Sequence, residues 1–260
     1  MTSGTDGCRI GLRHRAERIA SAPVKPPGPL LAAGRDADIF EYGPGLVLRR
    51  SREGRSMADE ARTMAYLHER GYPVPAVEEL SDDGSELVME RIEGRSMVDA
   101  IAAAPWSVRR QARILADLHS QLHDIGAPDF LPSAPVGAGD RILHMDLHPL
   151  NVMIAPKGAV VIDWTGAAAG DPLVDVGVAW VLMAAGQIPG SSLMATLLGW
   201  GRALLVNGFV SRFDRRAVTS RLRAVVEWKV TDPHMSDAEV AGMWKVVENA
   251  EARARRSSRR

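Results

Sequence analysis

The segment HMDLHPLN, residues 144–151, concentrates side chains that can do chemistry: two histidines, an aspartate and an asparagine within eight residues. Its proline, Pro149, prevents a regular helix through the middle of the segment. Such a set could bind a metal ion, transfer a proton or simply shape a turn. The segment alone leaves these interpretations open, so the rest of the chain has to distinguish them.

Metal binding is one interpretation. On an extended strand His144, Asp146 and His148 would point to the same side, because alternate residues of a strand face the same way. That arrangement would suit a metal-dependent hydrolase, but further ligands would be needed, and the sequence has no second cluster of the H-E-x-x-H kind. A polar loop whose histidines bond only to the backbone is another alternative, and we interpret His148 as structural.

Spacing favours a third interpretation, phosphoryl transfer. Asp146 stands five positions before Asn151, and Asp163 follows the apolar run VVI twelve residues after that asparagine. Phosphoryl transfer needs a carboxylate that orients the attacking hydroxyl and accepts its proton, and oxygen ligands that hold Mg²⁺ against the nucleotide phosphates. Oxygen ligands are those that Mg²⁺ prefers. The whole series, HMDLHPLN and then VVIDW, is a strong signal although its parts are weak.

The elements that precede this series predict a small, mainly antiparallel sheet with one inserted helix. Apolar and β-prone runs in residues 30–50 are divided by a Gly-Pro-Gly turn at 43–45, which predicts a hairpin. Runs at 75–80 and 86–91 predict a second hairpin. Between them, residues 56–75 predict a helix. The buried stripe expected on that helix is Met57, Ala61, Met64 and Leu67.

The remainder of the chain reads mainly as helices. Residues 105–126 predict a long amphipathic helix, and two apolar runs joined by a turn at 156–158 follow it. From about residue 173 onward we expect helices only. The buried side of the long helix is predicted to carry Ile114, Leu115, Leu118 and Leu122. The tryptophans expected in the core of the later helices are Trp180, Trp200, Trp228 and Trp244.

The stretch HMDLHPLNVMIAPKGAVVIDWTGAAAGDPLVDVG closely resembles the catalytic segment of the aminoglycoside phosphotransferase and choline kinase-like superfamily. The D-W pair in place of D-F-G, and the downstream G-D-P-x-x-D, favour this superfamily over protein kinases. The resemblance runs from about residue 30 to 185. It implies an α+β, two-lobed protein-kinase-like fold. We expect a lead-in of residues 1–29, a nucleotide-binding lobe of residues 30–92, and a helical catalytic and acceptor-binding lobe of residues 93–260.

The resemblance also implies roles for individual residues. Asp146 would be the catalytic base, and Asn151 and Asp163 would be the Mg²⁺ ligands. His144 would brace the loop through hydrogen bonds. Asp175 would be the buried carboxylate that supports this loop from the following helix.

In the N-terminal half such an enzyme needs a cation that meets the nucleotide phosphates and a helix glutamate that holds it. No lysine lies between Lys25 and Lys157, so the family's usual lysine is missing, and Arg49 in the run VLRR stands at the expected place. An arginine supplies the charge and a bidentate grip. Glu60, on the inserted helix, is the natural partner, although both side chains could instead be exposed surface charges.

Two further nucleotide contacts are expected from the order of elements in the chain. The loop that begins at Gly34 and ends at Asp38 would cover the phosphates with its backbone N–H groups, with one glycine where protein kinases have three. In the run LVMERIEG, backbone groups of Met89, Glu90 and Arg91 would bind the adenine edge.

Composition limits the choice of partners. The 260 residues carry 32 basic and 32 acidic side chains, so no global charge would recruit nucleic acid or an anionic membrane. A single cysteine, Cys8, excludes an internal disulfide and a multi-cysteine zinc site. The N-terminus lacks the apolar stretch of a signal peptide. The longest apolar run, residues 174–186, falls short of the roughly 20 residues of a membrane span. We therefore expect a cytoplasmic enzyme without nucleic-acid or membrane partners.

Together these observations predict a kinase that transfers the γ-phosphate of ATP or GTP, with Mg²⁺, to a hydroxyl of a small molecule. An aminoglycoside or amino sugar is one class of acceptor, and antibiotic resistance is suggested by the family name only. Because an aminoglycoside is polycationic, carboxylates should line its site, unless these belong to a solvated helix face. A non-catalytic nucleotide-binding protein is the main alternative, since Arg49 replaces the usual lysine. The candidate carboxylates are Asp232, Asp237, Glu239, Glu248 and Glu251.

Overall fold

The computed structural model describes residues 20–21, 26–34, 36–186, 192–233 and 235–257. Backbone contacts divide the chain into two compact units, Met1–Glu93 and Gly94–Arg260, which are described separately here. Most of the expected lead-in, residues 1–29, lies outside the described residues, and so does Cys8.

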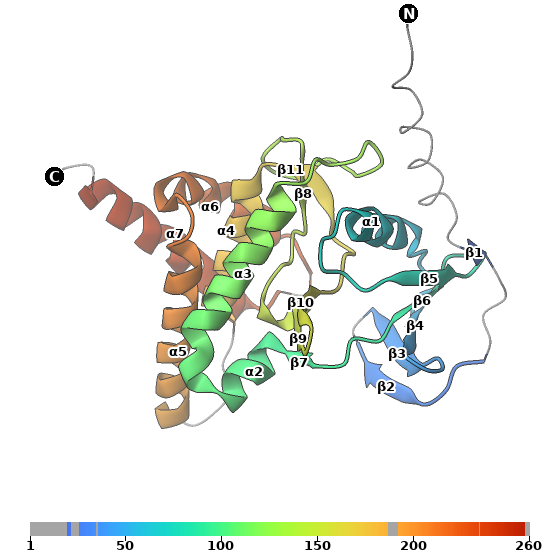
Figure 1. Ribbon diagram of the computed structural model, residues 1–260. Coiled ribbons are helices and arrows are strands. Elements are labelled where there is room, and N and C mark those ends of the chain that lie inside the picture. Colours follow the sequence, from blue (N-terminus) through green and yellow to red (C-terminus); the bar gives the residue numbers. More distant parts are fainter. Residues whose placement is uncertain (1–19, 22–25, 35, 187–191, 234, 258–260) are drawn as a thin grey trace, which may run out of the picture. The chain divides into compact units, whose positions relative to one another are not determined.

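The described part of the first unit contains a six-stranded sheet in the order β1-β5-β6-β4-β3-β2 (Figure 1). Its strands are β1 (Ala20–Ser21), β2 (Leu30–Ala33), β3 (Ala37–Glu41), β4 (Leu46–Ser51), β5 (Val77–Leu80) and β6 (Glu86–Glu90). All neighbours are antiparallel except β1 and β5. Both predicted hairpins are present. The turn between β3 and β4 contains Gly43 and Gly45, both with positive φ, which glycine adopts without a steric penalty.

The predicted inserted helix is α1 (Ala58–Glu69), which packs against β5. Its expected apolar stripe is buried: Met57, Ala61, Met64 and Leu67 are each at most 7% exposed. Glu60 lies on this buried side too, at 5% exposure. The helix therefore presents one carboxylate inward, beside the apolar residues that attach it to the sheet.

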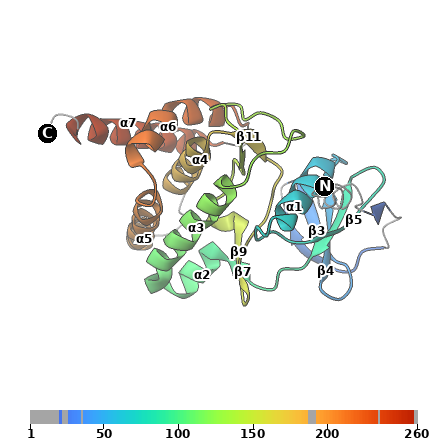
Figure 2. The same cartoon turned by 45° about the horizontal axis from the view of Figure 1, so that its top comes forward.

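The second unit is mainly helical. Its helices are α2 (Met97–Ala103), α3 (Val108–His123), α4 (Pro172–Ala185), α5 (Ser192–Val210), α6 (Arg215–Lys229) and α7 (Asp237–Ser257). Helix α4 packs against α5, α6 and α7, and α3 runs beside α5 (Figure 1 and Figure 2). Most residues of α4 are apolar and buried, as expected for a helix surrounded by others. The predicted α+β fold, with a small antiparallel sheet, one helix and a larger helical part, is confirmed.

Two small sheets and one short 3-10 helix hold the segment with the histidines, and a second 3-10 helix precedes α3. The small sheets comprise β7 (Arg95–Ser96), β8 (Arg141–Leu143), β9 (Val152–Ala155), β10 (Gly158–Val161) and β11 (Ala168–Gly170). The 3-10 helices are η1 (Pro105–Ser107) and η2 (Pro149–Asn151). Strands β9 and β10 form the predicted hairpin, and β8 pairs antiparallel with β11. The stretch 144–167 thus begins directly after β8 and ends directly before β11, and the pairing of these two strands fixes both of its ends.

The return from β11 into α4 is tightly packed. At Gly170 a Cβ atom would lie 2.7 Å from Ala134 Cβ and 3.0 Å from the Gly137 backbone oxygen, so a larger residue would not fit beside β8 without a shift. Asp171 then caps α4: its Oδ1 accepts a hydrogen bond of 2.9 Å from the Leu173 N–H, and Pro172 is the first helical residue. The motif G-D-P therefore sets where α4 begins.

Two predictions about the helical part were wrong in detail. The long helix starts at Val108, and Ile114 is partly exposed, whereas Leu115, Leu118 and Leu122 are buried. Only Trp180 of the four tryptophans expected in the core is buried.

Trp200 is 71% exposed. It stands nine residues before the fully buried Phe209, which is about half a turn of rotation at roughly 100° per residue, so it faces away from the core side of α5. Trp228 and Trp244 are half-buried.

Candidate active site

A buried carboxylate in the first turn of α4 holds the start of the catalytic segment. Asp175 is fully buried, and its two oxygens accept hydrogen bonds from consecutive backbone N–H groups, His144 at 3.2 Å and Met145 at 2.7 Å. His123 Nε2, on α3, lies 3.0 Å from the same carboxylate. The support role that the resemblance implied for Asp175 thus has a matching geometry.

The ionisation of Asp175 agrees with this role. Burial alone would raise its pKa, but the hydrogen bond from His123 and the neighbouring histidines outweigh burial and hold the pKa below its ordinary value. Asp175 is therefore a charged acceptor at neutral pH, and charged acceptors form stronger hydrogen bonds.

The backbone of the segment is strained at two positions. Met145 has φ of 64° and Asp163 has φ of 65°, a left-handed conformation that disfavours residues with a Cβ atom. These two residues lie immediately before Asp146 and at the end of the apolar run after β10. Such conformations persist only where the surroundings determine them, and they cluster at functional sites. In this case the hydrogen bonds of Asp175 hold the first of the two.

The structure brings Asp146 and Asn151 into direct contact. The Asn151 side-chain amide donates to the Asp146 backbone carbonyl at 2.9 Å and to its carboxylate Oδ2 at 3.1 Å. The backbone carbonyl of Asn151 accepts a hydrogen bond of 3.0 Å from the N–H of Ile162, the residue directly before Asp163. Asn151 stands directly before β9 and Asp163 shortly after β10, so both lie at the open end of this hairpin. The Asp163 Oδ1 accepts a hydrogen bond of 2.5 Å from Thr165 Oγ1.

His144 links the two arms of the segment. Its side chain is buried, Nε2 lies 3.1 Å from the Ile162 carbonyl, and its ring is 4.5 Å from that of Trp164. Because a carbonyl can only accept, Nε2 must carry the proton. This geometry suits the bracing role that was expected for His144.

The environment of Asp146 keeps it ionised. Burial alone would raise its pKa, but His148, whose Nε2 is 3.5 Å from Asp146 Oδ2, lowers it, and Lys229 and His144 add to this effect. The pKa therefore lies below its ordinary value. His148 also accepts a hydrogen bond from the Leu150 N–H, through Nδ1 at 3.3 Å. This bond caps the turn before β9, in line with the structural role predicted for His148.

The donor chemistry fits Mg²⁺ better than a histidine-bound metal. Both contacts of the Asn151 side-chain amide nitrogen are with Asp146, so the side-chain oxygen Oδ1 of Asn151 is the atom that could serve as a metal ligand, and Asp163 offers a carboxylate. Oxygen donors of this kind suit Mg²⁺, which is usually held by one or two side chains together with substrate phosphates. His144, by contrast, is buried and uses its Nε2 to bond the Ile162 carbonyl. Among the described residues no group of three or more His, Cys, Asp and Glu could hold a metal ion.

In the first unit, Arg49 on β4 and Glu60 on α1 form an ion pair. Their side chains are only 12% and 3% exposed, so they are not the surface charges of the alternative interpretation. The neighbouring Arg50 points elsewhere and pairs with Glu86. The strand therefore directs one guanidinium to the helix and the next one toward the neighbouring strand.

Gly34, at the start of the expected phosphate loop, lies close to Ala37. Its N–H donates to the Ala37 carbonyl at 2.9 Å, and a Cβ atom at this position would lie 2.5 Å from the same oxygen. Asp38, at the end of the loop, forms an ion pair of 2.6 Å with Arg52. The close approach of Gly34 to the Ala37 carbonyl thus leaves no room for a side chain.

The residues expected to bind adenine have partners within the first unit. The Glu90 N–H donates to the Ala76 carbonyl and the Arg91 N–H to the Gly45 carbonyl, both at 2.8 Å. Met89 is paired in the sheet with Val47 and Val77. The assignment of Met89, Glu90 and Arg91 to the nucleobase remains a prediction based on chain order.

Sequence reasoning missed two histidines behind the loop. His119 and His123 lie on the buried face of α3, and their rings are 5.7 Å apart. His119 is fully buried, and desolvation lowers its pKa to about 4. The signal was present, because both histidines share the helical face of Leu115 and Leu122, but a polar residue on an apolar stripe does not indicate its partner. His123 and Asp175 are 52 positions apart in the chain.

No helix within the described ranges has the length and apolar character that crossing a membrane requires.

Comparison with solved structures supports the fold. The chain is similar to a choline/ethanolamine kinase family protein from Mesorhizobium loti, with 17% identity, a TM-score of 0.56, and coverage of 90% of this chain and 92% of the other. It is similar to the ADP-bound aminoglycoside phosphotransferase APH(2'')-Ib, with 13% identity, a TM-score of 0.55, and coverage of 88% and 94%. Amicoumacin kinase hAmiN, in complex with AMP-PNP, gives 14% identity, a TM-score of 0.51, and coverage of 86% and 88%.

Sequence comparison identifies the family. No curated protein sequence matches the chain. The profile of the phosphotransferase enzyme family, APH, matches residues 30–138 and 128–218, which together make up more than half of the chain. The match includes the catalytic segment and both candidate Mg²⁺ ligands. It confirms the predicted enzyme class, a small-molecule kinase, and the chain belongs to the phosphotransferase enzyme family.

Proposed function

We propose that the protein transfers the γ-phosphate of ATP or GTP to a hydroxyl group of a small molecule, with Asp146 as the base. Asn151 and Asp163 would hold Mg²⁺, which neutralises charge on the nucleotide phosphates when bound. The observation that carries this proposal is the contact of the Asn151 amide with the Asp146 carboxylate, directly before the β9–β10 hairpin that Asp163 follows. We assign nucleotide binding to residues 30–92 and catalysis and acceptor binding to residues 93–260.

The geometry around Asp146 suggests how the proton is handled. Asp146 Oδ2 is engaged by the Asn151 amide and approached by His148, so Oδ1 is the oxygen that would accept a hydrogen bond from the acceptor hydroxyl. A carboxylate with a lowered pKa is a weak base, which suits a loose transition state in which the proton moves late. Asp146 would first orient the hydroxyl and then take its proton as the bond to phosphorus forms.

In the first unit, Arg49 would meet the α- and β-phosphates, and Glu60 would fix the direction of its guanidinium. Burial of both side chains supports this role. A buried guanidinium needs a charged partner, and the Glu60 carboxylate on the helix supplies it. The turn at Gly34 would cover the phosphates. Backbone groups of Met89, Glu90 and Arg91, or of the residues beside them, would contact the nucleobase.

The acceptor is a hydroxyl compound whose class is narrowed by the charges of the helical part. Three of the carboxylates that could line a site for a polycation already have partners. Asp232 pairs with Lys229 at 3.3 Å, Glu251 with Arg223 at 2.9 Å, and Glu239 accepts hydrogen bonds from Ser236. Lys229, one of the groups that lower the pKa of Asp146, is cationic. A neutral or singly charged acceptor, such as an amino sugar or amino alcohol, fits these charges better than an aminoglycoside.

The test is a coupled assay of nucleotide consumption with Mg²⁺ over a panel of aminoglycosides, amino sugars and amino alcohols. Rapid turnover of one compound would identify the acceptor. If that compound were an aminoglycoside, a cytoplasmic enzyme that phosphorylates it would be expected to confer antibiotic resistance. A flat panel with tight nucleotide binding would favour the non-catalytic alternative.

The role of Asp146 is tested with Asp146→Asn. We expect turnover to fall by about 10²–10⁴-fold, the usual contribution of a general base, with nucleotide affinity largely retained. The matched control is Asp140→Asn, a change of the same kind at a side chain that is 91% exposed, which should leave turnover unchanged. Loss of nucleotide binding together with turnover in Asp146→Asn would contradict the role assigned to this residue.

A further inference from the structure

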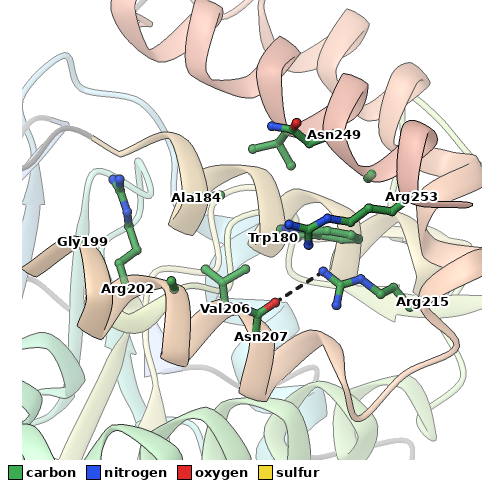
Figure 3. A pocket seen from close by; sticks show the side chains of 12 residues that line it. Trp180, Ala184, Gly199, Arg202, Val206, Asn207, Arg215, Asn249 and Arg253 are labelled. Atoms are coloured by element: carbon green, nitrogen blue, oxygen red, sulfur yellow. Dashed lines mark hydrogen bonds between the residues drawn. The ribbon is translucent and has the colours of Figure 1, made fainter. Parts of the chain in front are cut away.

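A hollow with a volume of about 320 Å³ lies among α4, α5, α6 and α7 in the second unit (Figure 3). It is open to solvent, and each of the four helices contributes to its walls. Its polar and aromatic lining comes from Trp180, Arg202, Asn207, Arg215, Asn249 and Arg253, and small apolar residues complete it. A hollow of this size is within the range of small-molecule sites.

The charge of this hollow is of one sign. It contains three guanidinium groups, and no aspartate or glutamate lines it. Among the ion pairs of the described residues none involves Arg202, Arg215 or Arg253. Nearby arginines of the same unit differ: Arg212 pairs with Asp117, and Arg223 with Glu251.

Two of the three guanidinium groups, those of Arg202 and Arg215, are held in place by neutral partners. Arg202 Nη1 donates to the Gly186 carbonyl at 2.5 Å. The Arg215 guanidinium lies 5.1 Å from the centre of the buried Trp180 ring, and its Nη2 is 3.4 Å from Asn207 Oδ1. Partial burial and the like charge of Arg253 lower the pKa of Arg215. The fold therefore keeps like charges close together without a carboxylate between them, an arrangement that an anion would stabilise.

This hollow is separate from the proposed catalytic groups of the same unit. Asp175, which holds the catalytic segment, lies in the first turn of α4, whereas Trp180 and Ala184 line the hollow further along this helix. At 1.5 Å per residue they are about 7.5 Å and 13.5 Å beyond Asp175 along the axis. No residue between 144 and 163 lines the hollow.

We propose that this hollow binds a small organic anion that carries at least two phosphate or carboxylate charges. Guanidinium groups grip both kinds of oxygen in a bidentate manner, and the amides of Asn207 and Asn249 can donate further hydrogen bonds. The small apolar side chains beside Trp180 accommodate the carbon skeleton of such a ligand. Phosphate esters and polycarboxylates share this chemistry, and the experiment separates them.

The experiment is isothermal titration of the full-length protein with pyrophosphate and, separately, with citrate, without Mg²⁺ or nucleotide. We expect saturable binding of at least one of the two, and at least tenfold weaker binding by the double variant Arg215→Gln/Arg253→Gln. Preference for pyrophosphate would identify a phosphorylated ligand, and preference for citrate a polycarboxylate. No saturable binding of either probe would overturn the proposal.

Three further variants locate the binding. Arg212→Gln removes an arginine of the same unit that lies outside the hollow, and it should leave affinity unchanged. Arg49→Gln tests whether pyrophosphate binds in the first unit instead; an effect of this variant alone would overturn the proposal. Gly199→Leu adds bulk without changing charge, because a Cβ atom at this lining position meets nothing within 4 Å. It should weaken binding as the double variant does, and unchanged affinity in both would contradict the site.

Discussion

Arg49 and Glu60 project from a strand and a helix of the first unit, so regular elements hold both charges and the backbone at neither residue has a positive φ. In the second unit, Asp146 and Asp163 lie outside regular elements, next to or within left-handed backbone, and the buried Asp175 holds their segment. The first pair is thus placed by secondary structure, whereas the backbone directly before Asp146 is held by the Asp175 side chain.

This difference indicates where each region is vulnerable. A substitution at Arg49 removes the charge that we propose to meet the nucleotide phosphates, but it leaves the hydrogen bonds of its sheet intact. A substitution at Asp175 removes the acceptor for two buried N–H groups and for His123. The first should therefore appear mainly in nucleotide binding, and the second in both stability and turnover.

The largest expected effect is that of Asp175→Ala. Removing one partner of a buried, hydrogen-bonded charge leaves the others without compensation, and we expect the free energy of unfolding to fall by about 3–5 kcal/mol. Turnover should fall as well, because Met145 loses the bond that holds its left-handed backbone. Urea denaturation followed by circular dichroism measures the first effect, and the coupled assay measures the second.

Asp117→Ala is the control for this variant, since Asp117 pairs with Arg212 at the surface and its loss should change stability by no more than about 1 kcal/mol. Equal stability losses in the two variants would mean that the catalytic segment does not depend on Asp175.

The next effect concerns the first unit. Arg49→Gln should raise the KM for nucleotide by about 10–100-fold, the equivalent of one lost charge-assisted interaction, with a smaller change in kcat. Arg49→Lys, which restores the charge, should recover part of the affinity. Arg50→Gln, on the same strand but paired with Glu86, is the matched control and should leave KM unchanged. If Arg49→Gln changed only stability, the ion pair would be structural.

The smallest expected effect is a pH dependence of the free energy of unfolding, which distinguishes the contribution of His119 from that of Asp175. The pKa of His119 falls from an ordinary value near 6.5 to about 4 in the folded protein, so only the unfolded chain gains a proton at this residue between these values. Stability should therefore decrease as pH falls through this window, by about 2 kcal/mol between pH 7.5 and pH 5. The lowered pKa of Asp175 acts differently, because its contribution persists until the pH falls below the ordinary aspartate value near 3.9.

His119→Gln checks this assignment. Urea unfolding at pH 7.5 and pH 5 should show a clearly smaller loss in the variant than in the wild type, because glutamine has no proton to gain. The same loss in both proteins would assign the pH dependence to another group.

The sequence predicted those features that depend on local pattern. The two hairpins, the stripe of α1 and the order of Asp146, Asn151 and Asp163 follow from turn residues, helical periodicity and spacing. The partnership of His123 with Asp175 could not be predicted, because it joins two helices far apart in the chain. The arginine-lined hollow could not be predicted either, because its walls form only when four helices pack together. The exposure of Trp200 depends on which face of α5 is covered.

Helix α4 connects the carboxylate that holds the Met145 backbone to one wall of the arginine-lined hollow. Asp175 in its first turn faces the loop with the strained methionine, while Trp180 further along lies beneath the Arg215 guanidinium. Each inserted or deleted residue between them would shift the later turns by about 1.5 Å and rotate them by about 100°. The length of this short stretch is therefore fixed by geometry at both ends, and it should tolerate substitutions far better than changes in length.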